Sequence, residues 1–576
     1  MGRIKPIMTN TEFARRSRFE KEVEDPNGLE KILAAGFLLL LLGLRFYFAS
    51  RFRIESDETQ HLHVVWGWVH GFVPYRDFFD NHTPLFHLLY APVLALLGER
   101  ADIVWWMRLS VFPLWALILW LVYKLGSDLH GKRVGMWAAV LAGAHTKTFF
   151  YSLEFRADDL WTALWVSTFL LLVGGELTKR RAFWGGVLLG MTFCTSLKTV
   201  LLAGSLALSA GCYLALVWKS GRRLDTRLIA GRVGVILSGA LLVPALILSY
   251  FAIRGALPSM YYCIIQHNLA PDLYSPSKRG LRRYILLLVL AVIVPLAYYL
   301  FRDREGNLRR GPILVFFTTA FYFFLLRNYW PMQTHQDYLP FVPMMMLAVS
   351  PWIMALGQRL GKVTHVGRTF TILLPVVASV FYLLHYRALA DDPGHLPTRL
   401  ARSLSLVLKL TEPSDYVFDK KGETVYRQRP YYFCFEEITY HRFAKGLLQD
   451  DIAEHLVRTR TPLVKRFRMP PKGRAFVDNN YLDIGYDFSV LGKLLQPLPS
   501  AGNTFEFQVI VPEKYVFLDR KGIVNGELDG VPVVGPQSMN AGPHRFTSAN
   551  HSGTLGLVWA RAYQRGFLPA AFANEK

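Results

Sequence analysis

Two neighbouring carboxylates, Asp57 and Glu58, stand in the segment RIESDETQHLHVV, shortly after the first long apolar stretch of the chain. A carboxylate fixed at the edge of a membrane can accept a proton from a hydroxyl group of a lipid-linked substrate, which is the task of a general base. A structural interpretation is equally simple, because Asp57 can cap the helix predicted after it by accepting hydrogen bonds from free backbone N–H groups. The residue types leave both interpretations open.

Two histidines, His61 and His63, follow this acidic pair closely. Aspartate and histidine are plausible ligands of a divalent metal ion. Residues two positions apart in a helix point to different faces, so the two imidazoles do not converge with Asp57 on one ion. A divalent metal cofactor held by Asp57 and one histidine stays open, and no metal ligand is assigned.

A second group of charges occurs in the segment SLEFRADDLW, which supplies Glu154, Arg156, Asp158 and Asp159. The last two suit the first turn of a helix, where negative side chains meet the positive end of the helix dipole. Taken alone, the segment favours this helix-start interpretation over a chemical role.

Two cations are candidates for binding a phosphate group. Lys198, in TSLKTV, stands next to apolar segments, and a lysine within a membrane is costly enough to be a functional candidate. Its long side chain can also simply reach the interface. Arg76, in PYRD, is a candidate on charge alone, because a phosphate leaving group needs its developing charge neutralised.

Polar side chains lie beside aromatic ones in two further segments, YYCIIQHNLAPDLYSPSKRG and RNYWPMQTHQDYLPFVP. His267 in the first, and His335, Asp337 and Tyr338 in the second, offer hydrogen-bonding groups next to rings, as sugar-binding sites do. Ordinary connecting loops are the alternative interpretation for each single residue.

The elements that must position these residues are predicted to be membrane helices. Of the 576 residues, 52% are hydrophobic and only 19% are charged, which is typical of a membrane protein. The net charge of +22 would also suit a nucleic-acid binder, but the apolar blocks are long enough to cross a bilayer, which takes roughly 20 residues. We therefore expect the lipid bilayer, and no nucleic acid, as a partner.

Eleven apolar segments are candidate spans. They are Ile32–Ala49, Ile103–Leu125, Val134–Phe150, Leu160–Gly175, Phe183–Leu197, Thr199–Trp218, Val233–Ile253, Tyr284–Phe301, Ile313–Leu326, Tyr338–Leu356 and Phe370–Tyr386. Alternate short connections between them are rich in Lys and Arg, which favours the cytoplasmic side for those connections. The N-terminus is then cytoplasmic, and the loop at 50–102 and the C-terminal region lie outside.

The sequence thus divides into a cytoplasmic segment at 1–30, a membrane domain at 31–388 and an outer domain at 389–576. The outer domain is expected to be mixed, with helices at Leu400–Leu410 and Asp450–Val457 and strands at Tyr416–Phe418 and Tyr431–Phe435. Its end, at 505–562, is expected to be β-rich, with strands at Phe505–Val511, Tyr515–Asp519, Gly530–Val534 and Thr554–Trp559. The four cysteines form no CxxC pair, and a bridge between Cys263 and Cys434 stays open.

The order of these motifs resembles a known family. The acidic pair directly after the first span, the segment GFVPYRDFFDNHTPLF, the RADD corner, TSLK and HQDYLPFVP are similar to the GT-C membrane glycosyltransferases. The branch that contains lipid A aminoarabinose transferases and protein O-mannosyltransferases is the most similar. The resemblance covers about Ile32 to Tyr386 and does not extend to the outer domain.

The resemblance implies an inverting transferase in the bacterial inner membrane that takes a sugar from a polyprenyl-phosphate donor on the periplasmic face. By motif position, Asp57, with Glu58 beside it, and Asp158 are the implied catalytic residues, and Lys198 is the implied phosphate contact. This chain departs from the pattern in its Thr59-Gln60-His61 sequence and in its outer domain. The acceptor therefore stays open between an envelope glycolipid, a polysaccharide and a protein.

Two other classes of function stay open. A lipid or glycan transporter (a flippase) also needs many spans and charged groups, but it predicts inverted repeats and broken helices, which the sequence does not clearly contain. A non-catalytic scaffold that binds glycans through its β-rich end would tolerate the loss of the Asp57 carboxylate.

Overall fold

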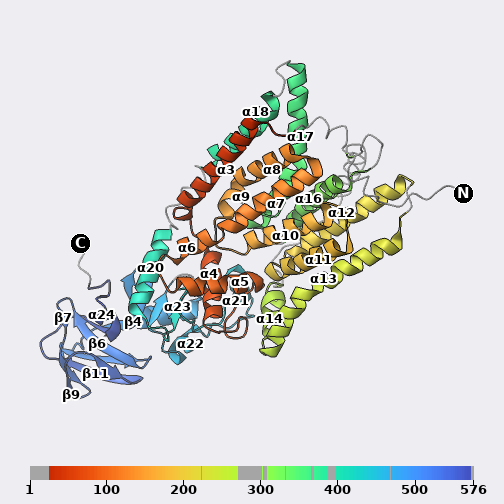
Figure 1. Cartoon of the computed structure of the whole chain (residues 1–576). Helices are drawn as coiled ribbons and strands as arrows, with labels where there is room; N and C mark the ends of the chain where they lie inside the picture. The colour runs from red at the N-terminus through yellow and green to blue at the C-terminus, as the bar shows by residue number, and fades with distance from the viewer. Residues whose placement is uncertain are drawn as a thin grey trace.

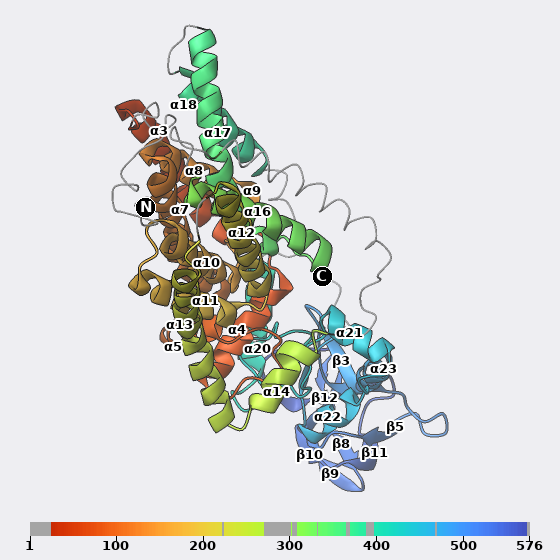
Figure 2. The same cartoon turned by 90° about the vertical axis from the view of Figure 1, so that its right-hand side faces the viewer.

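The computed structural model describes residues 25–221, 224–269, 301, 308–330, 332–364, 369–386, 397–466 and 469–572. A body of long helices makes up most of the molecule, and the C-terminal domain, drawn in cyan to blue, adjoins one end of it (Figure 1). The turned view shows the same two parts, with α14 (Leu257–Tyr261) lying next to the C-terminal domain (Figure 2). The fold is therefore the predicted one, a helical membrane body with a mixed α/β domain.

Six helical segments in the described ranges are long and apolar enough to cross a membrane. They are α3 (Gly28–Ala49), the continuous pair α6 (Ile103–Ser110) and α7 (Phe112–His130), α12 (Thr199–Lys219), α13 (Thr226–Ile253), α16 (Arg310–Tyr329) and α17 (Phe341–Val363). Shorter helices coincide with the other predicted spans, namely α8 (Lys132–Ala144) with α9 (Thr146–Tyr151), α10 (Asp158–Val173), α11 (Lys179–Thr195) and α18 (Thr369–Leu384). The predicted span Tyr284–Phe301 lies, except for its last residue, outside the described ranges.

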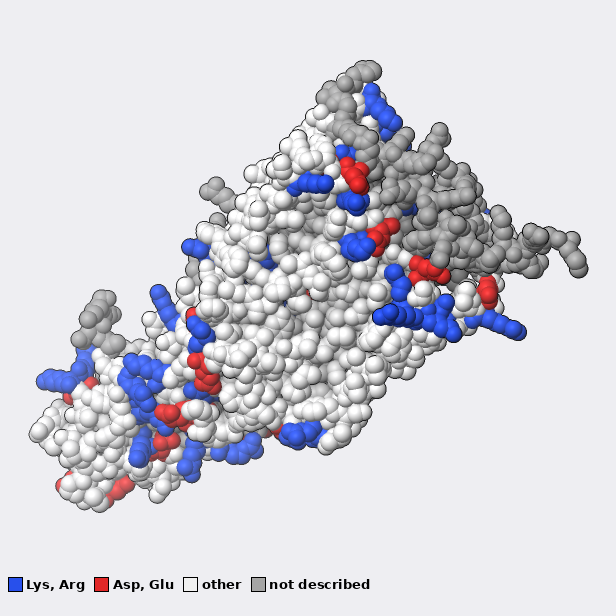
Figure 3. Space-filling model, viewed as in Figure 1, with Lys and Arg blue, Asp and Glu red and all other residues white. Residues whose placement is uncertain are grey.

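The surface agrees with this assignment. In the view of Figure 3, Lys, Arg, Asp and Glu gather at the two ends of the molecule and leave a wide belt with few charged side chains between them. Large apolar side chains such as Leu241, Leu246 and Ile253 are exposed on α13. An exposed apolar belt of this kind suits contact with lipid. The chain is a multi-pass membrane protein.

Two helices follow the first span, α4 (Ser56–Val69) and α5 (Leu85–Leu97). They lie where the helical spacing of Thr59–His70 and the apolar segment Leu85–Leu97 predict helices. The sequence pattern of α4 predicts a helix lying on the membrane surface. Residues 58–67 are instead buried on every side, because α5 and a loop of the C-terminal domain cover the helix. A domain distant in sequence therefore replaces the expected lipid contact.

The C-terminal domain contains two sheets with helices around them. The larger sheet has the order β1-β2-β4-β12-β6-β10, with β3 beside β4 and β7 beside β6, and the smaller has the order β5-β11-β8-β9. The strands are β1 (Val417–Phe418), β2 (Leu463–Lys465), β3 (Tyr481–Gly485), β4 (Phe488–Leu495), β5 (Thr504–Val509), β6 (Glu513–Asp519), β7 (Gly522–Ile523), β8 (Gly526–Leu528), β9 (Val531–Val533), β10 (Gln537–Met539), β11 (Gly542–Ser548) and β12 (Leu555–Trp559). The helices are α20 (Pro397–Leu410), α21 (Glu437–Ala444), α22 (Ile452–Arg458), α23 (Pro471–Asn480) and α24 (Ala560–Gln564).

One predicted strand is wrong. Tyr431–Phe435 is an irregular segment, in which the Arg429 guanidinium donates to the Phe433 carbonyl (3.0 Å) and the Phe435 amide donates to Lys420 (2.8 Å). These local bonds take the place of a strand ladder, while two of the aromatic side chains that gave the strand-like pattern pack on Phe443 of α21 and on Tyr262, the residue after α14. All four cysteines are free.

Close helix packing in the membrane body depends on small residues. Gly186 and Gly190 on α11 face the backbone of α13, and Gly239 on α13 faces the backbone of α11. A Cβ atom at Gly239 would collide with the Phe183 carbonyl oxygen. Small residues let membrane helices approach closely and gain packing contacts, so this seam holds α11 and α13 together.

We expect Gly239→Ala to lower the melting temperature of the purified protein in detergent, because the new methyl group forces the two helices apart at a cost of about 1–3 kcal/mol. Gly234→Ala is the matched control, since it lies on the same helix and a Cβ atom there has no neighbour within 4 Å. Equal melting temperatures for the Gly239→Ala and Gly234→Ala proteins would contradict the role of Gly239 in the packing of α11 on α13.

Candidate active site

The N-terminus of α4 is capped by Glu55 and Glu58, not by Asp57. The Glu55 carboxylate accepts from the Asp57 amide (2.6 Å), and the Glu58 carboxylate accepts from the Glu55 amide (3.2 Å), which is a reciprocal capping box. The capping interpretation of Asp57 is therefore wrong. Its carboxylate is left for contacts outside its own helix.

Asp57 lies between two cations. Arg156 Nη1 is 2.6 Å from Asp57 Oδ2, and the Lys421 ammonium bonds Asp57 Oδ1. Burial would raise the pKa of Asp57, but Lys421 and Arg156 hold it well below its ordinary value. The side chain keeps 20% of its surface exposed, so the charged carboxylate lies at the border of the buried cluster.

Arg156 connects the two acidic segments that the sequence analysis singled out. Its guanidinium contacts Glu55 (2.8 Å), Asp57 (2.6 Å) and Asp158 (3.1 Å), and it lies 3.9 Å from Glu154. Asp158 stands in the first turn of α10, as predicted. The structure thus brings the candidate catalytic residues Asp57 and Asp158 together on one arginine.

Glu58 lies behind this cluster. Both of its oxygens accept from Arg108 (2.6 and 2.8 Å), and one also accepts from the Phe155 amide (2.9 Å). Arg108 donates further to the carbonyls of Ala49 and Phe52 at the end of α3. Both side chains are fully buried, so in this geometry Glu58 fixes α4 against the membrane body and positions Asp57.

Lys198 pairs with Asp337, the residue that precedes Tyr338. Asp337 also accepts from the Thr334 amide (2.8 Å), which fixes the loop before α17. Lys198 keeps 22% of its side chain exposed and interacts electrostatically with Asp158. The predicted phosphate-binding lysine therefore lies beside the acidic cluster.

A second bridge from the same loop reaches Glu154. Gln336 Nε2 donates to Glu154 Oε2 (2.7 Å), and the other carboxylate oxygen is buried without a hydrogen-bond partner in the described part of the chain. Burial raises the pKa of Glu154 to about 8, and the nearby Glu58 and Glu55 add to the effect of burial against the opposing influence of Arg156. Glu154 is therefore mostly protonated at neutral pH.

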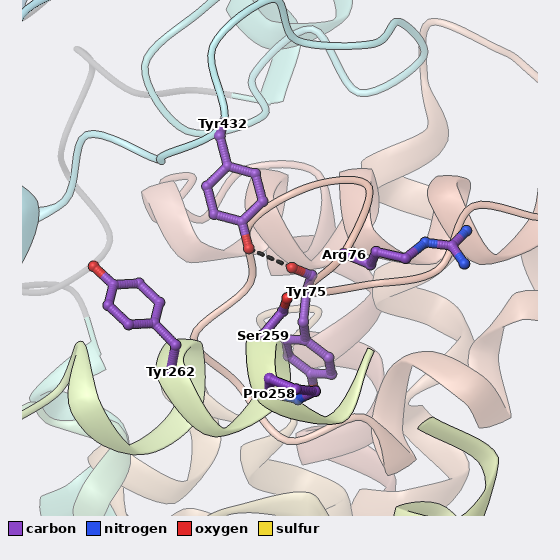
Figure 4. Close-up of a pocket in the computed structure, with 6 residues that line it drawn as sticks. All are labelled: Tyr75, Arg76, Pro258, Ser259, Tyr262 and Tyr432. Atoms are coloured by element: carbon purple, nitrogen blue, oxygen red, sulfur yellow. Dashed lines mark hydrogen bonds between the residues drawn. The ribbon is translucent and has the colours of Figure 1, made fainter. Parts of the chain in front are cut away.

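The other predicted site residues lie outside the cluster. Arg76 borders a pocket of about 410 Å³ with Tyr262 and Tyr432, but its guanidinium points away from the two tyrosines, and bonds Asp77 (2.7 Å) and the Arg254 carbonyl (Figure 4). His267 is buried against Glu436 (2.7 Å). His335 is exposed and stacks on Tyr151, and Tyr338 lies under the Lys147 ammonium (3.8 Å).

The histidines of the first loop bond partners other than Asp57. His61 Nδ1 is 2.7 Å from His87 Nε2, Asp80 bonds His82 (2.8 Å), and His63 Nδ1 donates to the Val425 carbonyl (2.8 Å). Within the described ranges, no group of three or more His, Cys, Asp or Glu side chains is arranged to hold a metal ion. Cations already cover both oxygens of Asp57, so this donor set does not fit a metal.

Two site residues were missed from sequence. Arg156 stood in the RADD segment without an assigned role, although an arginine among three acids signals an ion-pair network. Lys421 gave no signal at all, because it lies 364 residues after its partner Asp57 and in a domain outside the family resemblance.

No protein-family model matches the chain, and no curated protein matches its sequence. Two solved structures of ArnT from Cupriavidus metallidurans are similar in fold. The match to the apo structure covers 80% of this chain and 98% of the ArnT chain, with 12% sequence identity and a TM-score of 0.51. The match to the structure bound to undecaprenyl phosphate covers 79% of this chain and 97% of the ArnT chain, with 14% sequence identity and a TM-score of 0.52. The described chain therefore has the GT-C fold that its motifs predict.

Proposed function

We propose that this protein is an integral membrane glycosyltransferase that moves a sugar from a polyprenyl-phosphate donor to an envelope acceptor. The observation that carries the proposal is the cluster around Asp57, a charged carboxylate flanked by cations at the membrane edge of a GT-C fold. The likeness to an ArnT structure with bound undecaprenyl phosphate supports a lipid phosphate as the donor's carrier.

The proposed reaction is a single displacement. The acceptor hydroxyl attacks the anomeric carbon and gives its proton to Asp57. The bond from that carbon to the phosphate oxygen breaks, and its electron pair stays on the lipid phosphate. Because the hydroxyl attacks the face opposite the departing phosphate, the anomeric configuration inverts. Nearby cations stabilise the negative charge that grows on the phosphate.

Geometry ranks the other candidate residues. Lys198 borders the cluster and is favoured over Arg76, which lies in a separate pocket, as a phosphate ligand. Asp158 is proposed as a second acid of the site, and Asp337 and Tyr338 as acceptor or sugar contacts. His267 and His335 stay predictions without a contact to the cluster.

The site is proposed to face the periplasm of a bacterial inner membrane. Asp158 and Lys198 lie at the starts of α10 and α12. Lys179 lies at the start of α11, which follows the end of α10, and Lys219 lies at the end of α12. Lysines in short loops favour the cytoplasmic side. The acidic cluster and the C-terminal domain then lie outside.

We expect Asp57→Asn to lose transfer activity by a factor of about 10²–10⁴, since it removes the proposed base. Wild type and variant in nanodiscs are given a panel of radiolabelled polyprenyl-phosphate sugars and a cell-envelope extract, and donor consumption and labelled product are followed together. Asp487→Asn, an exposed residue of the C-terminal domain, makes the same chemical change as a control.

If Asp57→Asn transfers sugar as well as wild type does, Asp57 is not the general base. Wild type that moves intact donor across vesicle membranes without breaking it would favour the flippase alternative. Wild type that binds envelope glycans but neither consumes nor moves donor would favour the scaffold.

A second prediction concerns Glu154. Its pKa is about 8 in the folded protein against an ordinary 4.5, so the folded state keeps a proton that the unfolded state releases between these values. Wild-type stability must fall as pH rises through this window. Glu154→Gln removes the titration and can still accept from Gln336, so its melting temperature should exceed that of wild type by a margin that widens from pH 5.5 to 8.5. Parallel curves would show that Glu154 is not held protonated.

A further inference from the structure

A lysine of the C-terminal domain lies in the candidate active site. Lys421 lies in the loop between β1 and α21, and its ammonium bonds Asp57. This is the one hydrogen bond of that ammonium among the described residues. With Arg156 on the other oxygen, each oxygen of the proposed base is already bonded by a cation.

The loop that carries Lys421 is an ordered structure. The buried Asp419 carboxylate accepts from the amides of Gly422 (2.8 Å) and Thr424 (2.7 Å) and from Arg429 Nε (2.9 Å). These bonds close a tight turn around the lysine. The backbone of the loop is therefore fixed without help from the Lys421 side chain.

The same loop docks on the first outer loop. Gly422 has a φ of +81°, and a Cβ atom there would lie 2.7 Å from His63 Cβ, so only glycine fits this approach. His63 donates to the Val425 carbonyl (2.8 Å), and the Tyr426 hydroxyl donates to the Arg100 carbonyl (2.8 Å). These anchors do not involve the lysine, which is therefore free to change its partner while the loop stays in place.

The two cations on Asp57 differ in how firmly they are held. Arg156 also contacts Glu55 and Asp158, so its removal breaks several ion pairs. Within the described ranges the Lys421 ammonium has one hydrogen bond, made at the end of a flexible four-carbon stem to a carboxylate at the border of the cluster. Glu55 and Glu436 attract its charge without bonding it. If one oxygen of Asp57 is to be vacated, Lys421 is the cation that leaves.

We propose that Lys421 is a ligand of the donor phosphate and pairs with Asp57 only while the donor is absent. The inference rests on the proposed function. It gives the C-terminal domain a direct part in donor binding, and it couples arrival of the anionic donor to release of the base.

The charge changes of the reaction support this exchange. As the bond between the anomeric carbon and the phosphate oxygen breaks, its electron pair raises the negative charge of the phosphate. At the same time the acceptor proton neutralises Asp57, which weakens the attraction of the carboxylate for Lys421. The ammonium is thus bound more tightly to phosphate in the transition state than before it, which is the condition for catalysis.

The test measures affinity of the full-length protein in nanodiscs for undecaprenyl phosphate, with undecaprenol as the uncharged reference. Lys421→Ala should weaken binding of the phosphate about tenfold or more and leave undecaprenol unchanged. Asp57→Asn should strengthen it, because the lysine loses its competing partner. This gain in phosphate affinity should be absent when Asp57→Asn is combined with Lys421→Ala in a double variant. Lys472→Ala, an exposed lysine of the same domain, is the control and should bind as wild type.

Lys421→Arg keeps the charge and should retain phosphate binding, which separates charge from folding. The proposal is overturned if Lys421→Ala binds undecaprenyl phosphate as wild type does, or if the gain from Asp57→Asn persists in the double variant. Equal losses for undecaprenyl phosphate and undecaprenol also overturn it, because the lysine would then hold the site together without binding phosphate.

These outcomes are separate from those of the proposed function. A wild type that transfers sugar, together with a Lys421→Ala protein of unchanged phosphate affinity, leaves the transferase intact and removes only the role of Lys421. A wild type that does not distinguish undecaprenyl phosphate from undecaprenol removes the proposed donor itself.

Discussion

The Arg156 guanidinium is the interaction on which the site depends. Several carboxylates from two segments approach one another at a largely buried place, where like charges repel strongly. Arg156 lies between Glu55, Asp57 and Asp158 and makes this arrangement stable. Removing one partner from a buried ion-pair network costs about 3–5 kcal/mol, so this arginine constrains the surrounding loops as well as the charges. The neutral form of Glu154 lowers the repulsion further.

Two layers of ion pairs surround this centre. Glu58 at the start of α4 pairs with Arg108 of α6, which also bonds the end of α3. Lys198 at the start of α12 pairs with Asp337 in the loop before α17. Each pair ties a membrane helix to an outer segment. The position of Asp57 relative to the membrane is thus set by helices that are themselves fixed in the lipid.

Much of the fold could be predicted from sequence, because apolar length is a local property. Each predicted span in the described ranges coincides with a helix, and α5 lies where its apolar pattern predicts. The cap considered for Asp57 is wrong because the helix already begins at Ser56, with Glu55 as its cap and Asp57 inside the first turn. The burial of α4 and the contact of Lys421 could not be predicted, because both depend on how a distant domain docks. The prediction of a strand at Tyr431–Phe435 is wrong for a related reason, because the aromatic side chains of this segment pack against distant residues and not across a sheet.

The 364-residue separation between Asp57 and Lys421 also has a consequence for biosynthesis. The acidic half of the pair leaves the ribosome early, among the first elements to be inserted into the membrane. The basic half is synthesised only after the described membrane helices, as part of the C-terminal domain. A chain interrupted anywhere in between carries Asp57 without this cation, so the pair forms only after the described membrane helices have been synthesised.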